Sequence, residues 1–187
     1  MSWKTSKGAS AAGESLPKPP PVVLDSMVLI NLASAKLLDA IRGLPEAVLV
    51  PPRVLEETAG VGERLGYPEA IAIREAVEAG TLRVAREADS RVIQRLRRET
   101  RLREADASVV AIAMRERAYL GSDDAKVRRV AEFKGVTCGG TGYILSRLIA
   151  EGVLKRGEAR SSLDALIAGG WYCDVDTYAR ILGQLGL

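Results

Sequence analysis

The hydrophobic positions of the chain alternate between short, continuous apolar runs and longer segments with a helical period. Apolar runs at 21–24, 47–50 and 118–121 predict buried strands, and two weaker strands are expected at 81–85 and 135–138. Between them, apolar residues three and four positions apart predict helices at 26–41, 68–79, 89–98, 104–117, 122–133 and 141–151. Pro51 and Pro52 open a further short helix, and the glycine-rich segment 60–66 is expected to form a loop. This alternation predicts an α/β domain with a mostly parallel sheet.

The chain has 187 residues, which is enough for one substantial hydrophobic core. We expect a flexible tail at 1–20, one domain at 21–152, and an extension at 153–187 that packs on the same domain with helices near 162–168 and 176–182. The tail is rich in Gly, Ser and Pro and lacks the apolar centre of a signal peptide. No apolar run is long enough to span a membrane, so a cytoplasmic location is expected.

Histidine is absent from the sequence. Its absence excludes nucleophiles activated by histidine and the usual catalytic zinc sites. Cys138 and Cys173 lie far apart and fit no metal-ligand spacing, so they are expected to be reduced and structural. Any catalysis must therefore use carboxylates, lysines, hydroxyls or a bound hard cation.

Aspartates follow two of the predicted strands. Asp25 comes directly after the first strand, and Asp123 and Asp124 come shortly after the fourth. Ligands of open parallel sheets bind outside the carboxyl ends of the strands, where the strand order reverses, so these acids meet if the two strands are neighbours. The alternative is that Asp25, Ser26, Ser122 or Asp123 only caps the helix that follows.

Two further acids fall on the apolar side of predicted helices. Asp106 shares a helix face with Val110, so its carboxylate is expected to face the core, where a charge needs a partner or a metal ion. The alternative for Asp106 is a salt bridge to a buried arginine. Glu57 lies three residues after Val54 and is preferred over Glu56, which is expected to face water.

Carboxylates gathered without histidine form a site for a hard cation, and Mg²⁺ or Mn²⁺ fits such a site best. The ion would lower the pKa of a bound water and neutralise charge on a phosphodiester. The acids expected to take part are Asp25, Glu57, Asp106, Asp123 and Asp124.

The formal net charge is only +3, but basic residues crowd two short stretches of the chain. We expect a surface that follows nucleic-acid phosphates, with Arg95, Arg98, Lys126 and Arg129 as the candidate contacts. The alternative, given equal weight, is an ordinary solvated helix face.

Aromatic residues make up only 4% of the chain, which is too few to argue for a base-stacking platform. Trp171 is expected to belong to the core. The glycine-rich segment 139–142 resembles a phosphate-binding turn but lacks the Gly-Lys-Ser/Thr ending, so we interpret it as turn chemistry before a helix.

With these residues identified, the chain resembles the PIN-domain family in four fragments that occur in the family's order. The family's opening strand, acid and helix match VVLDSMVLINL, which implies Asp25 as the first acid of a metal site. Its second strand and P-x-x-V-x-x-E pattern match VLVPPRVLEET, which selects Glu57. Its third acid, on a helix, matches Asp106 in EADASVVAIAM. Its fourth acid falls in YLGSDDAKVRRVAEFKGV, where Asp124 is preferred and Asp123 remains open.

The resemblance implies a three-layer α/β/α fold around a five-stranded sheet of order 3-2-1-4-5, which would set Asp25 and Asp124 side by side. It also implies Mg²⁺ or Mn²⁺ and the cleavage of RNA.

The C-terminal part resembles a subgroup related to VapC-type toxins, many of which form homodimers and are neutralised by a small antitoxin. In that subgroup an acid often occupies the position of Glu104, so Glu104 is expected either to support the metal ligands or to be one of them. Ser26 and Ser122 are also expected to support the ligands. The tail and the extra C-terminal helices depart from a short VapC toxin, which weakens the toxin role more than the nuclease chemistry.

Three functions compete at this point. The main hypothesis is a metal-dependent ribonuclease, with the toxin of a toxin–antitoxin pair as one candidate role for it. The second is a catalytically weak RNA- or protein-binding module that has kept the acids. The third is phosphoryl transfer through an aspartyl phosphate, but the Asp-x-Asp pattern of one large phosphatase class is missing because Ser26 and Met27 follow Asp25.

Overall fold

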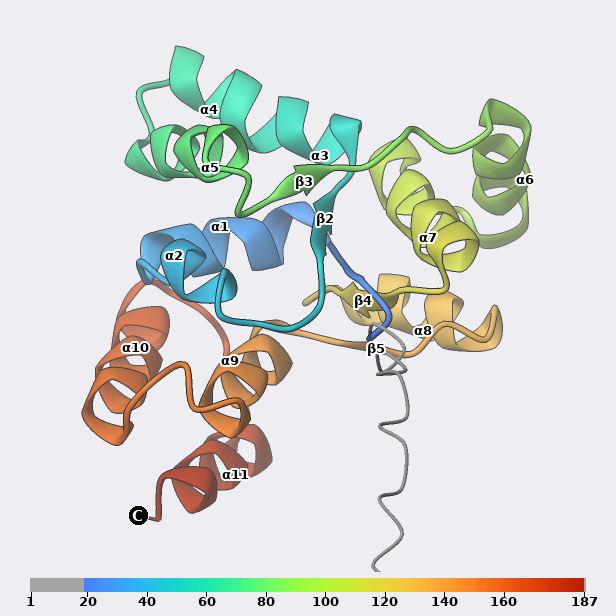
Figure 1. The fold of residues 1–187 in the computed structure, drawn as a ribbon. Helices are drawn as coiled ribbons and strands as arrows, with labels where there is room; N and C mark the ends of the chain where they lie inside the picture. The colour runs from blue at the N-terminus through green and yellow to red at the C-terminus, as the bar shows by residue number, and fades with distance from the viewer. Residues whose placement is uncertain (1–18, 187) are drawn as a thin grey trace, which may run out of the picture.

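A computed structural model describes residues 19–186 and places a five-stranded parallel sheet at the centre of the molecule (Figure 1). The strands lie in the order β3-β2-β1-β4-β5 and every neighbouring pair is parallel. Their bounds are β1 (Val22–Leu24), β2 (Val48–Val50), β3 (Arg83–Val84), β4 (Tyr119–Gly121) and β5 (Cys138–Gly139). The predicted fold class and strand order are confirmed. The two weakly predicted strands are the edge strands, and each is only two residues long.

Helices cover both faces of the sheet. One side carries α1 (Ser26–Ser34), α2 (Leu38–Ile41), α5 (Pro68–Glu78) and α9 (Thr141–Ala150), and the other carries α6 (Ser90–Thr100), α7 (Glu104–Glu116) and α8 (Ala125–Phe133) (Figure 1). The helix α7 is the best buried, because every residue from Ala107 to Ala113 lies inside the core. Its burial explains why this segment is so rich in Ala and Val: small and branched side chains let the helix sit closely on the sheet.

The segment after β2 is more helical than its glycines predict. It forms α3 (Pro52–Leu55), a π-helical turn η1 (Glu56–Gly60) and α4 (Val61–Arg64), so the predicted loop at 60–66 is wrong. A Cβ on Gly62 would lie 2.7 Å from the Cβ of Ala70. This glycine therefore allows two helices to approach closely and does not mark a turn.

Two other helix boundaries differ from the sequence-based expectation. The predicted helix at 26–41 is interrupted, because Lys36 adopts a positive φ of 57° between α1 and α2. The helix α10 (Arg156–Ala168) begins six residues before the expected start at 162. Its first turn is held by Glu158, which accepts a hydrogen bond from the backbone N–H of Lys155 at 2.9 Å.

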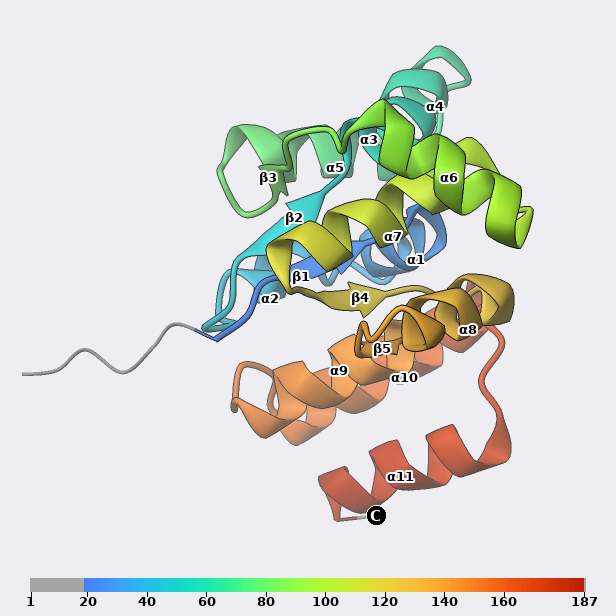
Figure 2. The same ribbon diagram turned by 90° about the vertical axis from the view of Figure 1, so that its right-hand side faces the viewer.

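The last two helices share the core of the sheet domain. The helix α10 packs on α1 and α9, and α11 (Val175–Leu185) packs on α9 and α10, lying farthest from the sheet (Figure 2). Leu163, Leu166 and Ile181 belong to the same buried cluster as the sheet residues. No helix within 19–186 is long and apolar enough to cross a membrane.

The register of β1 and β4 fixes the position of the acids. Leu24 pairs with Gly121, and the backbone N–H of Asp25 donates to the carbonyl of Gly121 at 2.9 Å. The chain therefore leaves both strands at the same edge, at the point where the strand order reverses. Asp25 and the Ser122–Asp124 segment emerge side by side at this edge.

Candidate active site

Asp25 is the buried acid of the site, with only 8% of the residue exposed. It caps α1, and its Oδ1 accepts a hydrogen bond from the backbone N–H of Val28 at 2.9 Å. Burial raises the pKa of Asp25 to about 6; hydrogen bonds from Ser122 and Val28 oppose this rise, and the charges of Asp123 and Asp106 add to it. Asp25 therefore caps a helix and also lies among acids, so its negative charge is poorly compensated.

Asp123 and Asp124 are neighbours in sequence but have different surroundings. Both oxygens of Asp123 are held: Oδ1 by the backbone N–H of Thr141 at 2.8 Å, and Oδ2 by the Thr141 hydroxyl at 2.6 Å and the Asn31 amide at 2.9 Å. Asp124 is exposed and caps α8 through Oδ1 alone, which accepts the backbone N–H groups of Lys126 and Val127 at 2.6 and 3.2 Å. Its Oδ2 forms no hydrogen bond with any residue of 19–186, so it is the freer ligand.

Glu57 lies in the π-helical turn η1 and reaches the first residue of α1. The Ser26 hydroxyl donates to Glu57 Oε2 at 2.9 Å. Glu56 instead forms an ion pair with Arg64 at 3.2 Å. The helix-to-π transition thus directs the second of these adjacent glutamates, and not the first, toward the residue beside Asp25.

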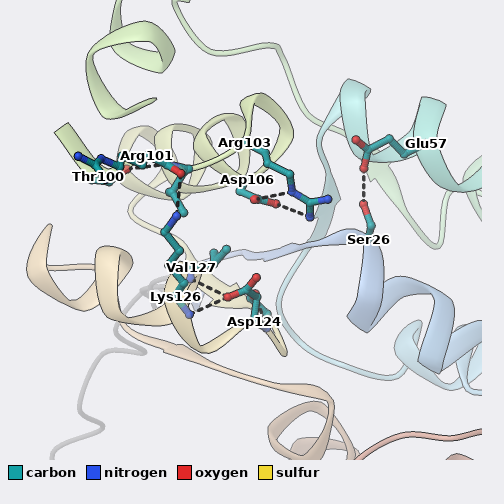
Figure 3. Close-up of polar contacts among 11 residues, drawn as sticks. Ser26, Glu57, Thr100, Arg101, Arg103, Asp106, Asp124, Lys126 and Val127 are labelled. Atoms are coloured by element: carbon teal, nitrogen blue, oxygen red, sulfur yellow. Dashed lines mark hydrogen bonds and ion pairs between the residues drawn. The ribbon is translucent and has the colours of Figure 1, made fainter. Parts of the chain in front are cut away.

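Asp106 lies in the first turn of α7, and its side chain is 19% exposed. Arg103 donates to it from Nε at 3.2 Å and from Nη2 at 3.5 Å. The pKa of the Arg103 guanidinium is raised mainly by this hydrogen-bonded pair, and further by the charges of Glu57 and Asp124. Figure 3 shows Arg103 extending from Asp106 toward Ser26 and Glu57. Asp106 therefore has an arginine partner, although the partner is an exposed residue and not a buried one.

Glu104 is neutralised by other side chains. It forms ion pairs with Arg53 at 2.8 Å and with Arg97 at 3.3 Å. Arg53 also pairs with Glu87 at 3.0 Å, so these charges form a small network between α3, α6 and α7. Glu104 is tied to this network rather than to Asp25.

The acids do not form a ready-made metal centre. Across the part of the chain that the structure describes, no three Asp, Glu or Cys side chains stand together as a set that could hold an ion. The chemistry of the donors nevertheless fits a hard divalent cation, because all are carboxylates and the most buried of them carries an uncompensated charge. Figure 3 shows the Arg103 guanidinium between Asp106 and Glu57, and it engages both oxygens of Asp106, so Arg103 must leave Asp106 before these oxygens are free for an ion.

The candidate RNA contacts lie on α6 and α8, which flank α7. Lys126 Nζ donates to the carbonyl of Arg101 at 2.7 Å, which links the two helices, and Arg129 Nε donates to Ala125 O at 3.3 Å. Arg95 faces Glu99 at 3.8 Å, whereas Arg98 forms no ion pair within residues 19–186. Lys126 and Arg129 follow Asp124 along α8, so these two cations lie on the helix that Asp124 caps.

Sequence comparison decides the family. A family model described as a PIN domain matches residues 21–187. The chain belongs to the PIN-domain family. PIN domains are generally nucleases, so membership indicates a nuclease-type function that acts on nucleic acid.

The three-dimensional comparison agrees with this assignment at the level of the fold. The PIN domain described here is similar to the crystal structure of PAE2754 from Pyrobaculum aerophilum, with a TM-score of 0.55 and 18% sequence identity. The match covers 70% of this chain and 96% of that chain. Comparison with curated protein sequences finds no match.

Sequence reasoning missed three residues of this site. Asn31 and Thr141 hold Asp123, and Arg103 holds Asp106. The signals were weak: an asparagine within an apolar helix, and a threonine after two glycines that were interpreted only as a turn. Arg103 was one of many arginines in its stretch, and nothing in the local pattern separates it from the others.

Proposed function

We propose that this PIN domain is a metal-dependent ribonuclease that hydrolyses RNA phosphodiester bonds. The observation that carries the proposal is the position of Asp25, a buried acid at the point where the strand order of the sheet reverses. The negative charges of Asp123 and Asp106 repel its own charge. A buried carboxylate of this kind is stabilised by a cation, and a PIN-family chain without histidine has only carboxylates to hold one.

In this proposal Asp25, Asp106 and Asp124 hold Mg²⁺ or Mn²⁺. When bound, the ion would supply a water of lowered pKa and charge neutralisation at the phosphate. Asp123 adds negative charge beside Asp25 but is a poorer ligand, because three donors already occupy its two oxygens. Ser122 supports Asp25 by its hydrogen bond, and Asp124 offers the free Oδ2.

In this proposal Glu57 takes the proton. Its Oε2 accepts the Ser26 hydroxyl, which orients the carboxylate and leaves Oε1 to accept a proton from an attacking water. Arg103, once released from Asp106, is free to contact the phosphate that RNA brings to the site. Arg95, Arg98, Lys126 and Arg129 would guide the rest of the strand across α6 and α8.

The decisive experiment replaces the acids one at a time by their amides. Asp25→Asn and Asp106→Asn should each lower Mn²⁺-dependent RNA cleavage by about a hundredfold or more, and calorimetry should show weaker Mn²⁺ binding. Asp164→Asn, an acid paired with Arg160 on α10, is the matched control and should leave both unchanged. Full activity of Asp25→Asn and Asp106→Asn would refute the proposal.

The ion pair between Arg103 and Asp106 supports a second candidate, a PIN-like module that binds RNA or protein with little turnover. In that case Arg103 would remain on Asp106, and the protein would retain RNA without cleaving it in either Mg²⁺ or Mn²⁺. A small antitoxin partner, a homodimer and a toxin role stay predictions from the VapC resemblance, and a cytoplasmic location stays a prediction from the sequence. Light scattering of the purified chain, with and without the product of any adjacent small gene, tests the first two.

A further inference from the structure

A cavity of about 630 Å³ adjoins the acid site. It lies between β4, β5, α9 and the segment that leads into α11. Its most distinctive lining residues are the four aromatics Tyr119, Tyr143, Trp171 and Tyr172 and the two cations Arg128 and Arg180. Asn31 and Asp123 also line it, so the cavity meets the acid site at Asp123.

Three glycines shape the wall of this cavity. A Cβ on Gly139 would overlap the Tyr119 hydroxyl, one on Gly140 would overlap Asp123 Oδ1, and one on Gly142 would lie 3.2 Å from the Trp171 ring. The glycine-rich segment 139–142 is therefore more than a turn, because it lets aromatic rings and Asp123 pack directly against the backbone.

The aromatic residues gather although the chain has few of them. Tyr119 and Tyr143 are stacked, with ring centroids 3.9 Å apart and planes 13° from parallel. Trp171 is half-buried, so its expected place in the core is only partly correct, and Tyr172 is 86% exposed at the cavity mouth. Aromatic faces of this kind accept nucleobases of any sequence.

The cations of the cavity keep most of their donors free. Arg128 donates one hydrogen bond to the carbonyl of Ser122 at 2.8 Å, and Arg180 donates one to the Ser146 hydroxyl at 3.1 Å. Neither forms an ion pair with an acid of residues 19–186. The carboxylate of Asp174, which also lines the cavity, is engaged by the backbone and hydroxyl of Thr177 at 2.8 and 3.0 Å. The guanidinium groups are therefore available to a phosphate.

We propose that this cavity binds one nucleotide of a single-stranded RNA, with the base against the aromatic residues and a phosphate on Arg128 and Arg180. The inference rests on the proposed function for the identity of the strand, because the cavity opens beside the acids that would cut it. The site would seat a nucleotide adjacent to the scissile bond, so binding there fixes which phosphate reaches Asp25. A single strand is required, because a base that is paired and stacked in a helix has no free face for the aromatic residues.

The test uses the full chain without metal, so that nothing is cleaved. The sequence has two tryptophans, and Trp3→Phe leaves Trp171 as the sole tryptophan reporter. In this background, uridine and adenosine 5′-monophosphates should change Trp171 fluorescence on titration in EDTA. Inorganic phosphate and ribose 5-phosphate should bind at least about tenfold more weakly, because they lack the base.

Matched variants locate the ligand. Tyr172→Ala should weaken nucleotide binding roughly tenfold, whereas Phe133→Ala, which removes an aromatic that is 84% exposed at the end of α8, should not. Arg180→Gln should weaken the nucleotides but leave unphosphorylated uridine unchanged. Asp25→Asn should bind nucleotides as the wild type does, because Asp25 does not line the cavity.

The outcomes separate this inference from the nuclease proposal. Nucleotide binding that responds to Tyr172→Ala, in a protein that never cleaves RNA, would support the cavity site and refute the nuclease. Mn²⁺-dependent cleavage with no nucleotide-induced change at Trp171, and with Tyr172→Ala fully active, would overturn the cavity site and leave the nuclease standing. Equal binding of inorganic phosphate and nucleotides would also overturn it.

Discussion

Asp25 and Arg103 are the two residues whose charges determine the state of the acid site. Asp25 is buried, and the negative charges of neighbouring acids repel its own charge. Arg103 partly compensates the charge of those acids from the solvent side. Without metal, the acid site therefore combines a buried anion with an arginine whose side chain is 85% exposed. The titration of Asp25 and the ion pair of Arg103 can each be measured without any assay of catalysis.

The pKa of Asp25 makes the stability of the metal-free protein depend on pH. A folded-state pKa of about 6, against an ordinary value of 3.8, means that the folded protein binds this proton more tightly than the unfolded chain does. The stabilising contribution is complete below the ordinary value and is lost as pH rises through about 6. Asp25→Asn removes the titration, so it should be more stable than the wild type near about pH 8 by up to about 3 kcal/mol.

Urea unfolding in EDTA across this pH range measures the effect. The gain of Asp25→Asn should shrink toward zero near about pH 4, and Asp164→Asn should show no such trend. A constant difference between Asp25→Asn and the wild type at all pH values would contradict the explanation. Added Mn²⁺ should raise the melting temperature of the wild type but not of Asp25→Asn.

Arg103 competes with a metal ion for Asp106. Arg103→Ala removes an exposed ion pair, which is worth about 0.5–1 kcal/mol, so Mn²⁺ should bind roughly two- to fivefold more tightly. The same variant should bind RNA less well if the freed guanidinium contacts phosphate. Arg160→Ala, which breaks a comparable ion pair on α10, is the control for calorimetry. Weaker Mn²⁺ binding by Arg103→Ala would show that Arg103 supports the acids rather than competing for them.

At the scale of elements, the turn from β5 into α9 couples the acid site to the cavity. Thr141 begins α9 and holds Asp123, while the neighbouring glycines receive Asp123 and the aromatic rings. The strand before this turn, β5, is only two residues long. The turn contributes mainly by positioning side chains from other elements.

Gly140→Ala tests this coupling. The new Cβ would lie 2.2 Å from Asp123 Oδ1, so Asp123 must move, at a cost of about 1–3 kcal/mol in unfolding free energy. RNA cleavage should fall together with the stability, because Asp123 lies beside Asp25. Gly157→Ala is the control: apart from its chain neighbours and the backbone of its own helix, no atom lies within 4 Å of the new Cβ, and alanine in α10 should be neutral or stabilising by up to about 1 kcal/mol. Unchanged stability and activity of Gly140→Ala would contradict the coupling.

At the scale of the whole molecule, the C-terminal helices complete both the core and the cavity. The helix α11 brings Arg180 to the cavity and buries Ile181 completely in the common hydrophobic cluster. The family match likewise extends through these helices to residue 187.

Ile181→Ala should therefore lower the stability of the entire molecule by about 2–5 kcal/mol, because it leaves a cavity in the shared core. Far-UV circular dichroism and Trp171 fluorescence should report one coincident unfolding transition. Ile167→Ala, at a position on α10 that is 42% exposed, should cost much less. A separate early transition seen only by Trp171 would show that the extension unfolds independently.

Much of this molecule could be predicted from local pattern. The alternation of apolar runs and helical periods indicated the parallel α/β sheet, and the acids at 25, 57, 106, 123 and 124 stood out because they follow strands or fall on apolar helix faces. The strand order came from the resemblance to PIN domains. These features are visible in sequence because side-chain periodicity and the ends of strands are local properties.

Only the tertiary structure decided which side chains meet. The glycines at 60 and 62 look like loop formers, yet they lie in closely packed helices; Trp171 and the tyrosines are scattered in sequence, yet they line one cavity. The partners of the acids also come from distant elements, as with Asn31 and Thr141 on Asp123. Local sequence indicates most of the secondary structure and each residue's tendency to be buried. Contacts between distant residues depend on how the helices pack, which no local pattern encodes.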